Sequence, residues 1–293
     1  MQKKRQFGLT GGLLDGVFLA GVAAIIAGAG GWVFGYGGLD VLRGAADESV
    51  AELEAVREAV DLSVPEPEPV DGIRPAADET LREISDEELS RMVLSLGLLG
   101  SEFASFAPEA DNGAVNIDTA SKDDFDAVEE RADLERSGFA SGYQAFYSYT
   151  IGTVSGSAYI GSQAALFQTA EGAADYMEDS DRENAEYAGK TVGSVTILEI
   201  ERFDVRVLAD EAAGARGTAR FAEEGGSSTD VWIVAVDFRR GRLIGSVGLF
   251  AVAPSEQDKK DLSRRVETLA ELMNQQMRTT LAARAVPTPA KVR

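Results

Sequence analysis

Apolar positions alternate with small or polar ones over much of the second half of the chain, a period that is typical of strands. The segments with this pattern are GYQAFYSYTIG, SGSAYIGSQAALF, SVTILEIERF, ARGTARFA and DVWIVAVDFRRGRLIGSVGLFAV. In the last one, Arg240-Gly241 suits a two-residue hairpin turn, because glycine tolerates positive φ. That turn would pair Phe238 with Leu243, Val236 with Gly245, Val234 with Val247 and Trp232 with Leu249. One face of the hairpin is then almost wholly apolar, as a core-facing antiparallel pair requires.

Four polar residues that can cap a helix are each followed by residues with a helical pattern. Ser85-Asp-Glu-Glu88 forms a capping box, Ser121 opens a second helix, and Thr169 caps a third. Ser255-Glu-Gln-Asp258 caps a long C-terminal helix, whose apolar stripe is Leu262, Val266, Leu269, Met273, Met277 and Leu281. Without an alternating β-α-β rhythm, the pattern predicts an α+β fold with an antiparallel sheet of about five to six strands, packed by helices.

The N-terminal region carries a charge-free run at residues 16–39. At about 1.5 Å per residue this run reaches about 36 Å, enough for a bilayer core of about 30 Å. Lys3, Lys4 and Arg5 precede it and acidic residues follow, so residues 1–15 are expected in the cytoplasm and the rest outside. We predict a single-pass transmembrane helix in the cytoplasmic membrane. The alternatives are a signal peptide cleaved at Ala27-Gly28-Ala29, which would give a secreted soluble protein, and a buried glycine-rich hairpin.

Four further segments follow the predicted anchor. Residues 40–60 form a charged juxtamembrane helix with a thin apolar stripe, and residues 61–84 form a linker rich in Pro and Glu. Residues 85–285 are expected to be one extracytoplasmic α+β domain, followed by a disordered tail at 286–293. The bilayer is therefore a predicted partner through residues 16–39.

Composition narrows the chemistry that the domain can perform. The chain has 28 basic and 49 acidic residues, a net charge of −21, and no cysteine or histidine. Such an acidic surface repels nucleic-acid phosphates, so we expect no nucleic-acid partner. Without histidine, the chain lacks the commonest general base and the commonest metal ligand. Without cysteine, it lacks a thiol nucleophile. We therefore predict no enzymatic activity, no cofactor and no metal site.

The order of the predicted strands and helices is similar to that of known domains. GYQAFYSY, an apolar strand, the helix AEGAADYM, a further strand, DFRRGRLIGSVG and a closing helix cover about residues 140–284. This order resembles exported bacterial α+β domains of the LpqN and PsbP-like kind. The resemblance implies a sheet covered by helices and no shared catalytic constellation.

Two other motifs do not meet their chemical requirements. NAEYAGKT has Asn184 where a phosphate-binding loop needs its first glycine, and acidic residues beside it would repel phosphate. Asp179-Ser-Asp181-Arg-Glu183 has calcium-loop spacing, but Lys190 stands where a bidentate glutamate is required. An ordinary loop and a solvated helix end explain these stretches better.

Aromatic residues crowd one predicted strand, at Phe139, Tyr143, Phe146, Tyr147 and Tyr149. Tyr143, Tyr147 and Tyr149 share one face and form a possible ligand platform, while the alternative is a strand packed on both faces. The sequence thus predicts a membrane-anchored, non-enzymatic binding or interaction domain, with a protein partner or a small ligand outside. The alternatives are a carrier of a lipid or other small hydrophobic ligand, and the secreted protein.

Overall fold

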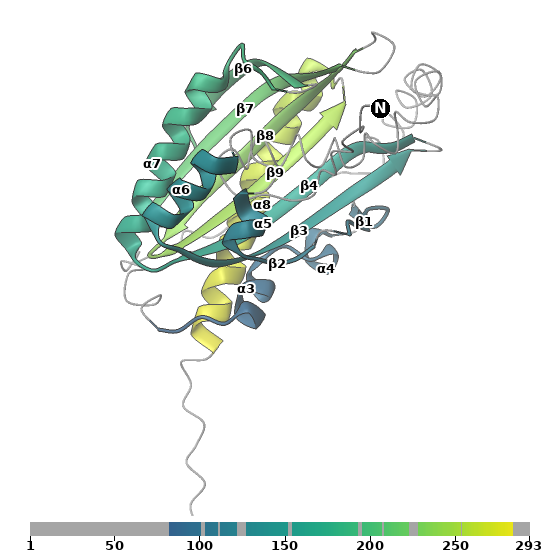
Figure 1. The fold of residues 1–293 in the computed structure, drawn as a ribbon. Coiled ribbons are helices and arrows are strands. Elements are labelled where there is room, and N and C mark those ends of the chain that lie inside the picture. The colour runs from purple at the N-terminus through teal and green to yellow at the C-terminus, as the bar shows by residue number, and fades with distance from the viewer. Residues whose placement is uncertain are drawn as a thin grey trace, which may run out of the picture.

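The computed structural model describes residues 82–283, with the exception of 101–102, 111, 122–126, 152–153, 193–194, 207, 223–227 and 253. The predicted anchor at 16–39, the helix at 40–60, most of the linker and the tail at 286–293 lie outside these residues. Within them, no helix is both long enough and apolar enough to cross a bilayer. Figure 1 shows a single large sheet with helices on both of its faces.

The described residues form six helices and nine strands. The helices are α3 (Asp86–Met92), α4 (Leu96–Leu99), α5 (Ile117–Ser121), α6 (Ala127–Ser137), α7 (Ala170–Tyr187) and α8 (Glu256–Ala283). The strands are β1 (Ala107–Pro108), β2 (Gly113–Val115), β3 (Phe139–Ile151), β4 (Val154–Phe167), β5 (Thr191–Val192), β6 (Val195–Phe203), β7 (Glu211–Ala222), β8 (Ser228–Arg240) and β9 (Leu243–Val252).

One antiparallel sheet contains all nine of these strands. Its order is β1-β3-β4-β9-β8-β7-β6-β5, and β2 also pairs with β3. The α+β class and the long C-terminal helix are confirmed. The sheet has nine strands, more than the five to six predicted. The additional strands β1, β2 and β5 have only two or three residues each, too short for an alternating pattern to reveal them.

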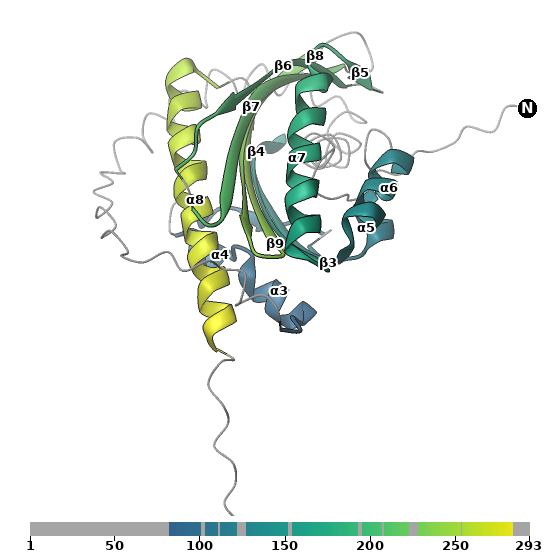
Figure 2. The same cartoon turned by 90° about the vertical axis from the view of Figure 1, so that its left-hand side faces the viewer.

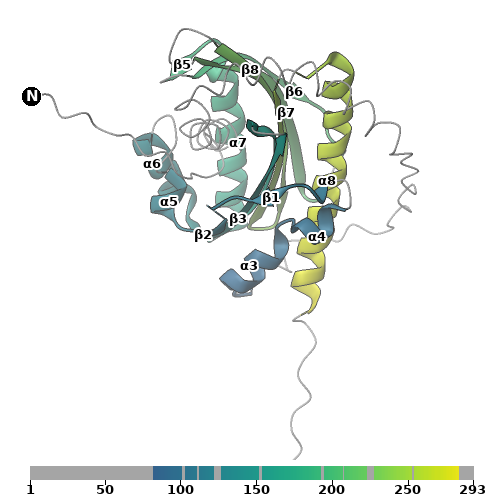
Figure 3. The same ribbon diagram turned by 90° about the vertical axis from the view of Figure 1, so that its right-hand side faces the viewer.

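The sheet separates two helical layers. Figure 2 shows the sheet curving around α7, with α8 on the opposite, convex side. Figure 3 shows α5 and α6 beyond α7 on the concave side. The convex layer holds the largest apolar cluster, in which the predicted stripe of α8 packs on the side chains of Trp232, Val234, Val236 and Phe238. Alternate residues of the same strands therefore face α8 or α7.

The register of the β8–β9 hairpin differs from the predicted one by two residues. Arg240 pairs with Leu243 and Phe238 pairs with Gly245, so the turn is Gly241-Arg242 and not Arg240-Gly241. Gly241 has a φ of 58°, which makes it the first residue of the turn with positive φ. Because a shift of two residues preserves the side-chain alternation, the predicted apolar face is nevertheless confirmed.

The second predicted helix start was wrong. Ser121 is the last residue of α5, and its hydroxyl donates to the carbonyl of Ile117 at 2.9 Å. A serine can bond a carbonyl one turn back as readily as it caps the following turn, so its type alone does not mark a start. The caps at Ser85, Thr169 and Ser255 are confirmed by their hydrogen bonds to Glu88, Gly172 and Asp258.

The close packing of the hairpin gives a first prediction. A Cβ at Gly245 would collide with the ring of Phe238, which is fully buried. Gly245→Ala should therefore lower the free energy of unfolding by about 1–3 kcal/mol, as overpacked cores do. Gly97→Ala is the control, because its Cβ would meet only Ser95 Oγ at 3.9 Å and would favour the helix. Equal denaturation midpoints for the two variants would contradict the packing.

Candidate functional site

The three tyrosines predicted as a ligand platform lie on β3. Tyr147 is buried in the cluster under α8, and its hydroxyl donates to the Leu94 carbonyl at 2.9 Å. Burial also raises the pKa of Tyr147 above its ordinary value. Tyr143 is half-buried and packs against the same cluster, while Tyr149 pairs with Ala158 along the strand. The platform stays a prediction, although the hydroxyl of Tyr147 already has a protein partner.

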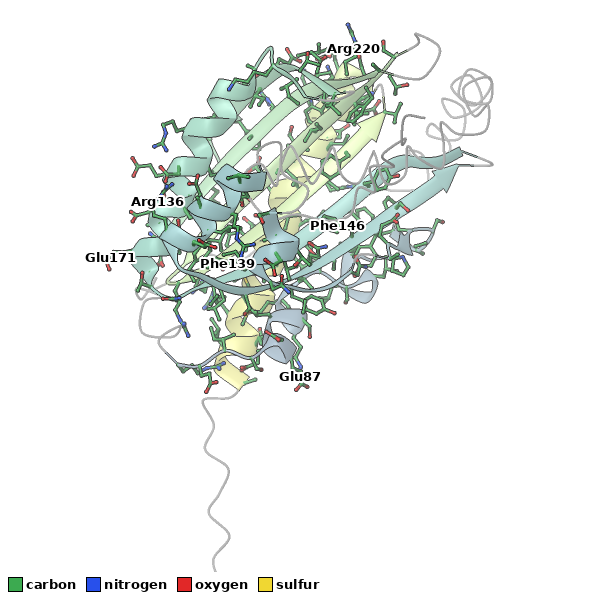
Figure 4. The ribbon with its side chains drawn as sticks, viewed as in Figure 1. Glu87, Arg136, Phe139, Phe146, Glu171 and Arg220 are labelled. Atoms are coloured by element: carbon green, nitrogen blue, oxygen red, sulfur yellow. The ribbon has the colours of Figure 1, made fainter. Side chains whose placement is uncertain are left out.

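Phe139 and Phe146 point to the other face of β3, and Figure 4 labels both along that strand. Phe146 does so by the alternation, whereas Phe139 does so because the register shifts between Phe139 and Ser141. Phe139 packs edge-on against Phe167, with ring centroids 5.8 Å apart. Phe146 covers the backbone of Gly161 on the neighbouring strand. The aromatic residues of β3 thus pack on both faces of the sheet.

A line of polar residues crosses the centre of this concave face. Gln144, Gln163, Ser246 and Asp237 are consecutive cross-strand partners on β3, β4, β9 and β8, and we call these four residues the polar row. On one side of the row lies the apolar cluster under α7, which includes Ala165, Phe167, Met177 and Ile244. On the other side, further along the strands, lies a second apolar cluster that includes Tyr159, Ile233 and Phe250. The polar row therefore interrupts a face that is otherwise apolar.

The polar row does not satisfy its own hydrogen-bonding groups. Gln163 is only 3% exposed, and the one hydrogen bond of its side chain among the described residues runs from the amide nitrogen to Gln144 Oε1 at 3.4 Å. The hydroxyl of Ser246 donates to one carboxylate oxygen of Asp237. In the described part of the chain, Ser246 is the only hydrogen-bond partner of the Asp237 side chain. The carbonyl oxygen of Gln163 and the second oxygen of Asp237 are left without donors among these residues. Buried polar groups are rarely left in this state.

The side chains around the polar row are small. The next line of cross-strand partners toward the second cluster contains Gly161, Gly248, Ala235 and Ala215. Its member on β3 is Phe146, whose ring covers Gly161. Asp237 and Ser246 keep part of their surface accessible, as do Ala213 and Ala215 on the neighbouring strand β7. These residues lie in interior strands of the sheet and on the face where α7 packs. The accessible surface is therefore a small patch in the middle of the concave face.

Asp237 is the only ionisable member of the polar row. Burial raises the pKa of Asp237 to about 6, and the hydrogen bond from Ser246 opposes this rise only in part. The carboxyl is thus surrounded by protein even though part of the residue remains accessible. A carboxylate that is surrounded by protein and has one neutral donor is destabilised by several kcal/mol unless a cation joins it.

Helices α6 and α7 on the concave side are held together by polar contacts. The hydroxyl of Tyr176 donates to Glu130 at 3.1 Å, and Arg136 bonds both Asp133 at 2.6 Å and Asp179 at 3.3 Å. Figure 4 shows Arg136 beside α7. Ser180 follows Met177 on the buried side of α7 and is 7% exposed, without a side-chain hydrogen bond to any described residue.

The two rejected motifs occupy the end of α7 and the segment that follows. Asp179 is ion-paired with Arg136 and Arg182. Gly189 and Lys190 connect α7 to β5, so the order is helix, loop and strand, the reverse of a phosphate-binding loop. In the described part of the chain, no group of three acidic side chains could hold a metal ion.

Sequence reasoning missed the polar row. Each of its members is a single polar residue at an inward position of an apolar strand, as in GYQAF, GSQAA, AVDFR and IGSVG. A single polar residue of this kind carries little information by itself. Only the strand pairing brings the four together, and the pairing could not be derived from the composition of separate strands.

Comparison with known proteins gives little further information. No protein-family model matches the chain, and no curated protein matches it. Among solved structures, the chain is similar to the extracellular domain of PknH from Mycobacterium tuberculosis, with a TM-score of 0.44 and 11% sequence identity. The similarity covers 71% of this chain and 100% of that domain. A similarity this distant carries no functional argument.

The raised pKa of Asp237 predicts how stability depends on pH. An acid with a folded-state pKa of about 6, above its unfolded value near 3.8, destabilises the fold increasingly as pH rises through this range. Asp237→Asn should therefore raise the free energy of unfolding by about 2–3 kcal/mol at pH 8 and change it little at pH 4. Denaturant unfolding at both pH values measures the difference.

Asp230→Asn is the matched control on the same strand. Its carboxylate accepts two hydrogen bonds from Arg220, which lower the pKa of Asp230, so this variant should lose a little stability at pH 8. An equal loss for Asp237→Asn at both pH values would mean that Asp237 is a structural partner of Ser246 only.

Proposed function

We propose that the chain is a membrane-anchored, extracytoplasmic and non-enzymatic binding domain that takes a small ligand at the polar row. The observation that carries this proposal is a pair of acceptors without donors in the described part of the chain, Gln163 Oε1 and the second oxygen of Asp237. They lie beside residues that keep part of their surface accessible. A ligand with hydrogen-bond donors would satisfy both groups. Proteins retain such costly groups mainly where function needs them.

A binding role fits the polar row better than catalysis does. Ser246 and Asp237 form a hydroxyl–carboxylate pair, but a full negative charge beside the hydroxyl would repel a developing oxyanion. The two residues lie in interior strands, where backbone N–H groups are used in the sheet ladder and cannot form an oxyanion hole. The polar row also contains no second ionisable group that could act as an acid opposite the base.

The location rests on the N-terminal sequence. The basic lead, the charge-free run at 16–39 and the stiff Pro-Glu linker together support an anchor with the domain outside the cytoplasm. Alkaline carbonate extraction of membranes should leave the full-length protein in the pellet. Release into the supernatant with an N-terminus near Gly30 would support the cleaved, secreted form instead.

A carrier of a lipid is the weaker alternative. A lipid tail needs a continuous apolar surface, whereas the polar row divides the concave face into two apolar clusters whose members are already buried. The small, partly polar patch therefore favours a compact polar ligand over an acyl chain.

Native mass spectrometry of the full-length protein in detergent tests the binding role. Wild type should show a bound small molecule, or gain thermal stability from at least one compound in a panel of amines, sugars, carboxylates and lipids. Ala213→Leu should abolish both effects, because it fills the patch opposite Asp237. Ala222→Leu, at the exposed end of the same strand, is the control. A wild type without any ligand in both assays would refute the proposal.

A further inference from the structure

The charges and hydrogen-bonding groups of the polar row define a class of ligand. This inference rests on the proposed binding function and names what the same site takes. We propose that the ligand is a small organic cation, whose ammonium group pairs with the Asp237 carboxylate while a second donor on the same molecule bonds Gln163 Oε1.

The polar row presents acceptors and a negative charge, without a compensating cation among the described residues. Asp237 interacts with one neutral donor, Ser246, and its nearest basic neighbour on the same face of β8 is Arg239. Arg239 is already engaged, with Nε bonded to Glu211 at 3.1 Å and Nη1 3.7 Å from Asp210. An ammonium group supplies both the missing charge and the missing donor, and a charge-assisted hydrogen bond is among the stronger polar contacts.

The helices on this side of the sheet reinforce the preference for a cation. Helix α7 contains seven acidic residues and one basic residue, and α6 contains four acidic and two basic. These helices therefore contribute a negative field on the concave side of the sheet, where the polar row lies. It attracts cations and raises the cost of placing a carboxylate or phosphate beside Asp237.

The spacing of these two acceptors sets the size of the ligand. Gln163 and Asp237 lie on β4 and β8, with β9 between them. Neighbouring strands are about 4.8 Å apart, so the two backbones are separated by about 10 Å. A short chain with one polar group at each end spans this distance, and the neighbouring residues Gly248, Ala235 and Ala215 have small side chains or none.

Four molecules of equal chain length test the class of ligand directly. The probes are 1,4-diaminobutane, 4-amino-1-butanol, 1,4-butanediol and succinate, titrated at pH 8 into the full-length protein by calorimetry. The first two should bind, whereas the neutral diol and the dianion should bind at least tenfold more weakly. Asp237→Asn should weaken amine binding at least tenfold, and Gln163→Leu should weaken it about threefold or more. Asp230→Asn, which removes an exposed carboxylate, should leave it unchanged.

The outcomes distinguish failure of the cation preference from failure of the binding role. If the diol or succinate binds as well as the amines and Ala213→Leu abolishes that binding, the site exists but does not select cations, and the inference is overturned. It is equally overturned if amine binding survives in Asp237→Asn while circular dichroism shows a folded protein. If neither these probes nor the wider panel binds, the proposed function itself fails.

Discussion

The β8–β9 hairpin is buried on both faces, and the positions of the other layers depend on this constraint. One set of its side chains packs under α8, and the alternate set lies on the concave face with α7. A slip of one residue would exchange the two faces and place Asp237 under α8. The hairpin therefore determines which helix meets which strand. A carboxylate at this place in the sheet lowers stability, and natural sequences retain such groups where they have a use.

Much of the fold could be predicted from the sequence, because local chemistry and global packing agree there. Alternation located the long strands, and the stripe of α8 is buried as its spacing indicated. Helix starts were correct where a polar cap preceded an apolar stripe, as at Ser85 and Ser255. The short strands were missed, because their formation depends on partners that are distant in the chain and not on their own residues. Ser121 was misassigned for a local reason, since its hydroxyl bonds a carbonyl one turn back.

The candidate site could not be predicted, and the reason is the hairpin register. With the turn at Arg240-Gly241, Asp237 would lie opposite Ile244, and no polar line would cross the sheet. The observed turn at Gly241-Arg242 places Asp237 opposite Ser246, which in turn pairs with Gln163. Both registers bury the same apolar set, so hydrophobic patterning does not distinguish them. The aromatic residues of β3 gave the stronger sequence signal, although strand packing accounts for Tyr147 and Phe139.

The first described residue is connected to the strand that carries Ser246. Arg82 pairs with Glu88 at 2.7 Å and holds the pKa of Glu88 at about 2, so this carboxyl group is ionised at neutral pH. Arg242, immediately before β9, donates to the Arg82 carbonyl at 2.5 Å and to the Phe167 carbonyl at 3.3 Å. The end of the predicted linker is thereby held against the hairpin turn.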